Sequence, residues 1–514
     1  MAADGGLVLS ASDAPPLGST RAETQPSLLM EYALFAAFVA LWAAYFTISE
    51  SPAAIHNDMA EAYAWGREFQ LGYNQHPPFW AWICGLWFAL LPRADWSFAI
   101  LASLNAAIGM VGSWRLIGRF AEGDKRIAAT LLLLLTPFYT FLSHKYNANS
   151  IFLSLWPWTL FFFVRSIETR ALGAGALFGL AMGLALMSKY YALILAATCL
   201  LAAIQHPARA HYFASAAPYI AIAVAAAICA PHLWWLATSG APPLRYLARI
   251  SAQNPLAMAR DAAAAFFGAS AQNGVVVAVV AYVARPSLSE AAAGLRARWA
   301  DWRFRFLATL AVAPLVLSVV AALALRTPLS TNMMIGVFSL TPLLAIDAFG
   351  ARGLARLRLI AARLVAALTL GAFAASPALA VARAWLSHDN ADIEPRKELA
   401  EAATQWWREK TGRPLAYVAG TTFYENGIAF YSSDRPHVFV GFEYFRNQWV
   451  TPRALADGGL LAACVWDDAL CLAETALFAT PQAKRTRITL AHDALGHEGK
   501  PVSFIVTAIP PWTR

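Results

Sequence analysis

Residues 31–49 read EYALFAAFVALWAAYFTIS, an apolar run whose only charge is at its first position. Runs of about 17–25 apolar residues can cross the hydrocarbon core of a bilayer as a helix. Because no water is present there to hydrogen-bond the backbone, such runs must be helical. Comparable runs predict about eleven transmembrane helices within residues 30–385, the other ten at 96–118, 127–142, 151–166, 171–187, 190–204, 213–236, 263–283, 305–325, 330–348 and 360–382.

The composition of the 514 residues agrees with this interpretation. Hydrophobic residues make up 59% of the chain and charged residues only 14%, whereas soluble domains carry about 25% charged residues. The net charge of +8 does not indicate a nucleic-acid partner, since the basic residues lie in short loops between apolar runs. The sequence therefore predicts a polytopic membrane protein.

The run Phe79–Leu91 is predicted to lie flat on the membrane surface and not to span it. It has only 13 residues and contains Trp80, Trp82 and Trp87, and tryptophan is enriched at the headgroup level. With the N-terminus inside, sixteen basic residues fall in inner loops and eight in outer ones, as the positive-inside bias requires. We therefore expect a multi-pass bacterial inner-membrane protein with a cytoplasmic N-terminus and a periplasmic C-terminal part.

Two polar regions flank the predicted membrane domain. Residues 1–29 lack the pattern of a secretory signal and are interpreted as a short disordered cytosolic tail. In residues 386–514, short apolar stretches alternate with helical patterns, which predicts a small α/β domain. The strands are expected near 415–418, 438–440, 460–465, 488–490 and 502–507, and the helices near 396–410 and 470–478. Since neither a P-loop nor a complete dinucleotide fingerprint occurs there, we assign this domain no chemistry.

The loop at residues 50–95 concentrates the groups suited to catalysis. It reads HNDMAEAYAWG over residues 56–66 and LGYNQHPP over residues 71–78. A carboxylate such as Asp58 or Glu61, held beside a membrane-facing cavity, is one way for an enzyme to obtain a base. Alternatively, Asp58 caps a short helix starting at Met59 and Glu61 completes a capping box.

This loop resembles the first periplasmic loop of bacterial polyprenyl-phosphate-dependent glycosyltransferases, relatives of protein O-mannosyltransferase and of the lipid A aminoarabinose transferase. The resemblance is carried by Asp58-x-Ala-Glu-Ala-Tyr63-x-Trp65-Gly66 and by Gly72-Tyr73-x-x-His76-Pro77-Pro78. Supporting pieces extend it over roughly residues 30–250: Leu135-Thr136-Pro137, Asn147-Ala148-Asn149, Ser188-Lys189-Tyr190 and Pro231-His232-Leu233-Trp234-Trp235.

The resemblance implies a GT-C fold and transfer of a sugar from a polyprenyl-phosphate donor to a lipid, glycan or protein acceptor at the outer leaflet. Asp58 matches the family's candidate general base, and His76 and Tyr73 match positions near the lipid phosphate. Two positions depart from the family pattern. Met59 follows Asp58 where many members have glutamate, which Glu61 can replace, and Asn149 stands where many have aspartate.

The chemistry of the donor suggests further residues. Negative charge grows on the phosphate as the glycosidic bond lengthens, and cations placed around it stabilise that charge. Outer basic residues are scarce, so Lys189, Arg245 and Arg249 are predicted to bind the donor phosphate. The alternatives are a snorkelling Lys189, a solvated face carrying Arg245 and Arg249, and a neutral interface histidine at His76.

The acceptor or sugar pocket is predicted to contain Tyr63, Lys145, Asn147, Asn149 and His232. A base acting on the acceptor hydroxyl predicts a single displacement with inversion. We expect no cofactor or metal, because a polyprenyl-phosphate donor has no diphosphate that needs a metal partner. Membrane lipids are further expected partners; nucleic acid is not.

Two rival functions remain open at this stage. One is a transporter or lipid flippase whose substrate path is lined by Lys189 and Arg245. No inverted repeat of the kind found in transporters is recognisable in the sequence. The other is a catalytically silent sensor in which the outer domain acts.

The five cysteines are too scattered for a disulfide scaffold or a metal site. Cys464 and Cys471 fall in the domain placed in an oxidising compartment, where disulfides persist. A turn between them can bring their α-carbons within the roughly 4.4–6.8 Å that a bridge needs. We expect this bridge, the alternative being that Cys464 is a buried strand residue. Cys84, Cys199 and Cys229 are expected to be free.

Overall fold

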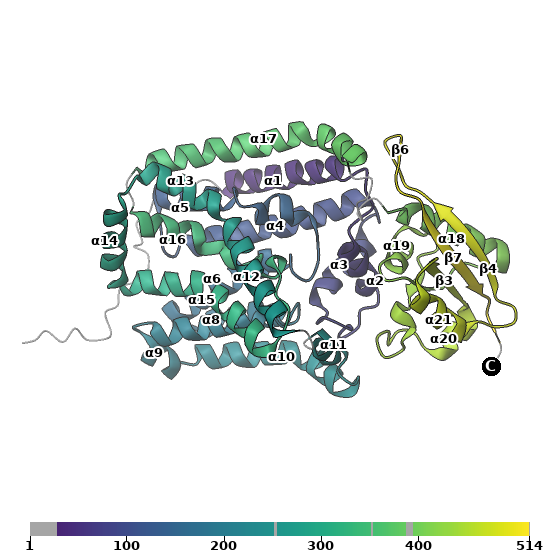
Figure 1. Ribbon diagram of the computed structural model, residues 1–514. Coiled ribbons are helices and arrows are strands. Elements are labelled where there is room, and N and C mark those ends of the chain that lie inside the picture. Colours follow the sequence, from purple (N-terminus) through teal and green to yellow (C-terminus); the bar gives the residue numbers. More distant parts are fainter. Residues whose placement is uncertain (1–27, 251–253, 351–352, 387–393, 513–514) are drawn as a thin grey trace, which may run out of the picture.

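The computed structural model describes residues 28–250, 254–350, 353–386 and 394–512. A bundle of long helices occupies one part of the molecule and a smaller α/β domain the other (Figure 1). The helices α2 and α3 lie between the two parts, whereas α9 and α14 lie at the opposite end of the bundle. The tail predicted at residues 1–29 falls almost wholly outside the described residues.

The helices up to the C-terminal domain are α1 (Leu28–Ser49), α2 (Asn57–Gly66), α3 (Phe79–Leu90), α4 (Asp95–Ile117), α5 (Gly123–Leu133), α6 (Phe152–Thr169), α7 (Leu172–Leu186), α8 (Ala192–Gln205), α9 (Arg209–Ala214), α10 (Ala217–Thr238), α11 (Pro242–Ile250), α12 (Pro255–Ala271), α13 (Gly274–Ala284), α14 (Leu288–Trp299), α15 (Trp302–Leu325), α16 (Thr341–Phe349) and α17 (Leu354–Leu386). Short 3₁₀ turns are η1 (Pro137–Tyr139), η2 (Phe141–His144), η3 (Thr331–Met334) and η4 (Val337–Leu340).

Four helices in the described part of the chain, α4, α10, α15 and α17, are long and apolar enough to cross a bilayer. The number rises to six if two bent pairs each count as one span. Each of the other predicted spans also contains helix, but in shorter or less apolar segments. The polytopic helical class is therefore confirmed, and the count of eleven stays a prediction.

Three predicted spans are not single continuous helices in the structure. The span at 127–142 breaks after α5, and the following segment, formed by η1 and η2, is bent by 72° relative to α5. Thr136 is extended at the break, because the residue before a proline is driven out of the helical region. The span at 263–283 bends by 43° between α12 and α13. The span at 330–348 consists of η3, η4 and the nine-residue α16.

The predicted surface segment Phe79–Leu91 is the twelve-residue helix α3, and it packs on α2. Two glycines let the backbones of these helices touch. A Cβ atom on Gly66 would lie 2.2 Å from the carbonyl oxygen of Ala81, and one on Gly85 would lie 2.1 Å from that of Gly66. Because real atoms do not approach this closely, any larger residue here would displace α2.

The C-terminal domain has the predicted α/β character. Its five-stranded sheet has the order β2-β1-β3-β7-β4, in which β1 runs parallel to β2 and β3, and β7 runs antiparallel to β3 and β4. The elements are α18 (Arg396–Thr411), β1 (Tyr417–Gly420), α19 (Tyr424–Tyr431), β2 (His437–Val438), η6 (Val440–Phe442), α20 (Pro452–Gly458), β3 (Leu460–Val465), α21 (Ala469–Phe478), β4 (Lys484–Leu490), β5 (Asp493–Ala494), β6 (His497–Glu498) and β7 (Val502–Ile509). All five predicted strands and both predicted helices are confirmed.

The expected disulfide is also present. Cys464 at the end of β3 is bonded to Cys471 in α21, with their α-carbons 5.7 Å apart. Cys84, Cys199 and Cys229 are free thiols, as predicted.

Alkylation of denatured protein is expected to label three thiols without reductant and all five after reduction, because only one pair is bridged. Mass spectrometry of the labelled peptides measures this count. Labelling of Cys464 without reductant, in protein purified from membranes under non-reducing conditions, would contradict the bridge.

Candidate active site

Asp58 lies in the first turn of α2, but it does not cap the helix. The N-cap is His56, whose Nδ1 accepts a hydrogen bond from the Asp58 backbone N–H at 3.2 Å. The interpretation of Asp58 and Glu61 as a capping box was therefore wrong. Since another residue satisfies the helix start, the Asp58 carboxylate is available for other contacts.

The carboxylate of Asp58 is held from one side by Asn147. The Asn147 side-chain N–H donates to Oδ2 of Asp58 at 2.8 Å, while its Oδ1 accepts from the backbone N–H groups of Asn149 and Ser150, both at 2.9 Å. These two backbone donors fix the orientation of the amide. The second oxygen, Oδ1, has no hydrogen-bond partner among the described residues and lies 3.8 Å from Nδ1 of His56, and the Asp58 side chain is 39% exposed. The geometry therefore presents one carboxylate oxygen to an incoming group.

A cation lies next to this carboxylate. The Nζ of Lys189, in the turn between α7 and α8, donates to Oδ1 of Asn149 at 2.5 Å. Asn147 and Asn149 thus join Asp58 and Lys189 in one hydrogen-bonded line. The aspartate that the family often has at position 149 would pair with Lys189, whereas asparagine adds no charge, so Asp58 supplies the negative charge that acts on Lys189.

His76 faces the same lysine. Burial, reinforced by the Lys189 charge, lowers the pKa of His76 to about 3. The ring is therefore neutral at physiological pH and can act on a phosphate only as a hydrogen-bond donor. A neutral ring agrees with the alternative of a neutral histidine, and the place of His76 near the donor phosphate stays a prediction.

Glu61 differs from Asp58 in its environment. Burial, followed by the charges of Asp58 and Glu425, raises the pKa of Glu61 well above its ordinary value. Glu425 of α19 is itself buried, and burial raises its pKa to about 8. Glu425 thus favours the protonated form near neutral pH, and the raised pKa of Glu61 sets it apart from Asp58 as a base. The sequence contained no signal for Glu425, because only the fold brings α19 against α2.

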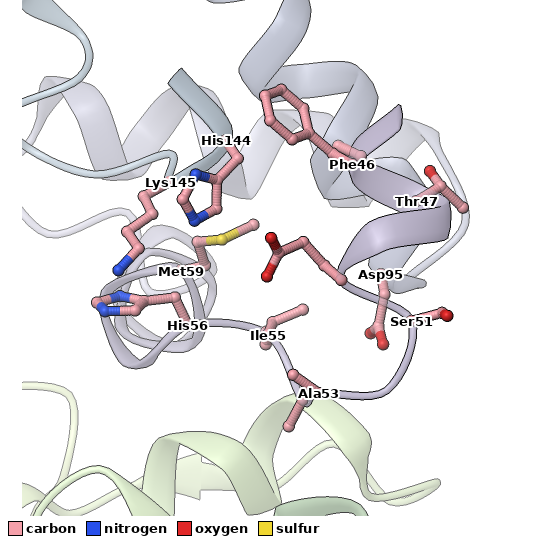
Figure 2. A pocket seen from close by; sticks show the side chains of 13 residues that line it. Phe46, Thr47, Ser51, Ala53, Ile55, His56, Met59, Asp95, His144 and Lys145 are labelled. Carbon is pink, nitrogen blue, oxygen red and sulfur yellow. The ribbon is translucent and has the colours of Figure 1, made fainter. Parts of the chain in front are cut away.

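A cavity of about 60 Å³ opens beside the start of α2. Its lining includes Lys145, His56, Ser51 and Asp95, and Figure 2 shows the first two side by side at one edge and the other two across from them. A water needs roughly 10–15 Å³ of such space and two or more polar partners. The cavity therefore suits water, and Lys145 faces it next to the helix turn that carries Asp58.

Three predicted site residues have structural contacts instead. Tyr63 packs between Phe88 and Phe430, with ring centroids 5.6 and 5.2 Å away. The Tyr73 hydroxyl donates to the Trp65 carbonyl at 2.6 Å. Both tyrosines therefore have internal contacts that shape the loop, and the roles of Tyr63 in the acceptor pocket and of Tyr73 at the donor phosphate stay predictions.

The third is His232, whose two ring nitrogens are both occupied. Nδ1 lies 2.7 Å from the Leu71 carbonyl oxygen, and Nε2 lies 2.8 Å from the Tyr190 hydroxyl. His232 thus ties α10 to the first loop and to the residue after Lys189, and has no ring nitrogen left for a sugar.

Arg245 and Arg249 lie one turn apart on α11, and both face the C-terminal domain. Their guanidinium carbons are 5.8 and 6.0 Å from the ring centre of Phe445. Neither has a described contact with Lys189 or Asp58, so they form a neighbouring group.

The C-terminal domain holds the segment that leads into Asp58. The buried Arg396 donates to the Ile55 carbonyl at 3.0 Å, and the Ile55 N–H donates to the Tyr431 hydroxyl at 2.8 Å. His492 lies 2.7 Å from the Pro52 carbonyl oxygen and 2.5 Å from the Glu398 carboxylate. A domain expected to carry no chemistry therefore positions the candidate base.

The contact at His492 is expected to depend on pH. The hydrogen bond to Glu398 raises the pKa of His492, against an opposing effect of burial and of Lys397. Stability from the protonated ring is thus fully present below about pH 6.5 and is lost as pH rises through the raised pKa. In thermal unfolding, wild type should be more stable than His492→Gln at about pH 5.5, and this difference in stability should shrink as the pH rises to about 9. A stability difference that stays constant with pH would exclude this role.

Part of the chain is similar in sequence to known proteins. Residues 75–235 match the family model described as dolichyl-phosphate-mannose-protein mannosyltransferase. Over 183 residues the chain is 28% identical to lipid A galacturonosyltransferase RgtD from Rhizobium johnstonii. The expected family resemblance is confirmed. These homologues are glycosyltransferases, and the family model matches the part of the chain that carries His76, Asn147 and Lys189.

Solved structures give the same fold over nearly the whole chain. ArnT from Cupriavidus metallidurans in the apo state superposes with a TM-score of 0.60 at 15% identity, covering 93% of this chain and 98% of ArnT. ArnT bound to undecaprenyl phosphate superposes equally well, with a TM-score of 0.60 at 14% identity. The chain thus has a GT-C fold. The RgtD alignment spans only 35% of this chain and 37% of RgtD.

Proposed function

We propose that this protein is a membrane glycosyltransferase that moves a sugar from a polyprenyl-phosphate donor to a lipid acceptor. The main observation in support is the line Asp58–Asn147–Asn149–Lys189, which sets an open carboxylate oxygen next to a cation. Its similarity to a lipid A galacturonosyltransferase and to ArnT bound to undecaprenyl phosphate favours a lipid acceptor and a polyprenyl-phosphate donor. Glycan and protein acceptors remain predictions from the family resemblance.

The reaction is a single displacement with inversion. Asp58 accepts the proton of the acceptor hydroxyl as that oxygen bonds to the anomeric carbon. The bond from the anomeric carbon to the phosphate oxygen breaks, and the electron pair leaves with polyprenyl phosphate. Asn147 holds the base in place, and the cavity beside His56 and Lys145 has room for water that can carry the proton away.

The donor phosphate is proposed to sit against Lys189, with neutral His76 as a hydrogen-bond donor. Because the lysine lies in a region of low polarity, its attraction to the growing phosphate charge is stronger than it would be in water. The uncharged Asn149 orients the ammonium group without neutralising it.

For the membrane arrangement we keep the eleven spans, the cytoplasmic N-terminus and the periplasmic C-terminal domain as a proposal. The bias of basic loops supports it. Figure 1 also agrees, since α9 and α14, next to basic loops, lie at the end of the bundle opposite α2, α3 and the C-terminal domain.

The test is incubation of purified protein with polyprenyl-phosphate sugars and a lipid extract from its native membrane. Transfer predicts release of polyprenyl phosphate together with a lipid whose mass has increased by one sugar. Movement of intact labelled donor across a proteoliposome membrane, without release, would instead establish a flippase. If neither occurs with well-folded protein, the proposal fails.

A further inference from the structure

Three arginines from two domains gather around one aromatic ring. The guanidinium carbon of Arg446, in the C-terminal domain, lies 5.6 Å from the ring centre of Phe445. Arg245 and Arg249 of α11 approach the same ring to 5.8 and 6.0 Å. We call these three residues the arginine cluster. Like charges brought together in this way repel one another unless an anion compensates them.

The cluster is only partly neutralised by the protein. Glu443 pairs with Arg446. Within the described ranges, neither Arg245 nor Arg249 has an acidic partner. Like charges one turn apart, such as these two, destabilise a helix unless an anion binds them. At least two positive charges thus remain for a ligand.

The loop that presents Arg446 is rigidly built. The fully buried Asn447 accepts from the Val440 N–H at 3.0 Å and donates to the carbonyls of Val440 and Glu443, both at 2.8 Å. Gln448 accepts from the Trp235 indole N–H at 2.6 Å, which fixes the loop to α10. A preorganised loop loses little freedom when it binds a ligand.

The surroundings point to a ligand that arrives from a membrane. Leu233 and Trp234, near the end of α10, and Leu244 of α11 are exposed. Tryptophan and arginine at one helix end are typical of the headgroup level of a bilayer. The cluster also adjoins the candidate active site, because Trp235, the partner of Gln448, stacks on His232 with ring centroids 5.5 Å apart.

We propose that the arginine cluster is an anion site, separate from Lys189, that binds a phosphate or carboxylate on the headgroup of the lipid acceptor. This inference rests on the proposed function and adds the chemical class of its acceptor, an anionic glycolipid. Arginine suits the task because its planar guanidinium group binds phosphate and carboxylate with two hydrogen bonds. The cluster thereby gives the C-terminal domain a direct part in acceptor selection.

The test compares Arg446→Ala with Arg453→Ala, a matched control on α20 whose side chain is 90% exposed. The acceptors are a bis-phosphorylated lipid A and its enzymatically dephosphorylated form. Arg446→Ala is expected to raise KM for the phosphorylated acceptor about tenfold, as loss of a charge-assisted bond does. KM for the donor and for the dephosphorylated acceptor should not change. Arg446→Lys should recover part of the affinity.

Binding is also measured without turnover, using phosphatidylcholine nanodiscs doped with either lipid A. Retention of the phosphorylated lipid should fall for Arg446→Ala and stay normal for Arg453→Ala. A rise in donor KM, or an equal loss with both acceptors, would overturn the acceptor assignment. If wild type transfers no sugar but retains phosphorylated lipid through Arg446, the proposed function fails and the anion site stands.

Discussion

Replacement of Asp58 by Asn is expected to lower the rate of sugar transfer by about 10²-fold or more, the usual cost of losing a general base. Asparagine has nearly the same shape, and His56 rather than Asp58 caps α2, so the helix should form normally. The loss should appear in kcat, because the carboxylate acts on the acceptor hydroxyl only as the new bond forms. Polyprenyl phosphate release under saturating donor and acceptor measures it.

Asp457→Asn is the matched control, since Asp457 is an exposed carboxylate of the C-terminal domain. Asn147→Ala provides a second variant that leaves the carboxylate in place but removes the donor to Oδ2. It should reduce kcat less than Asp58→Asn does and leave donor KM unchanged. Transfer at near-normal rate by well-folded Asp58→Asn would remove Asp58 from its assigned role.

Lys189→Ala should weaken binding of polyprenyl phosphate itself, with or without a sugar, by roughly 10- to 100-fold. The range follows from the roughly 1.5–3 kcal/mol of a hydrogen bond to a charged group. Low surrounding polarity places the effect toward the upper end. Isothermal titration or native mass spectrometry with polyprenyl phosphate measures it directly.

Lys484→Ala, an exposed lysine on β4, serves as the control for loss of positive charge. Lys189→Arg keeps the positive charge, so it should retain more affinity than Lys189→Ala does. It should still bind less tightly than wild type, because the contact with Asn149 is lost. If only acceptor affinity changed, the donor phosphate would have to lie elsewhere, with the arginine cluster as the next candidate. An Arg245→Ala variant separates the two sites. Weaker binding of polyprenyl phosphate would support the donor role predicted from the sequence, and unchanged donor binding would support the acceptor role of the arginine cluster.

Patterns local in the chain were predicted well, because they depend on neighbouring residues. Apolar length predicted the polytopic helical class, and the alternating segments of residues 396–509 predicted the strands and helices of the C-terminal domain. The break at Thr136–Pro137 also has a local cause, the extended preference of a residue before proline, which apolar length alone does not show. The first-loop motif led to Asp58, and the spacing of Cys464 and Cys471 to the bridge.

The sequence by itself determined the class of protein, the family resemblance and the residues able to act as base and cation. Only the tertiary structure decided which of them meet. It joined Asp58 to Lys189 through two asparagines, gave Tyr73 and His232 internal partners, and brought Arg446 to α11. The physical reason is that hydrogen bonds, burial and charge act over a few ångströms in space. Apart from Tyr73, whose partner Trp65 is 8 positions away, these partners are 40 or more positions apart in the chain, so no local pattern records their distances.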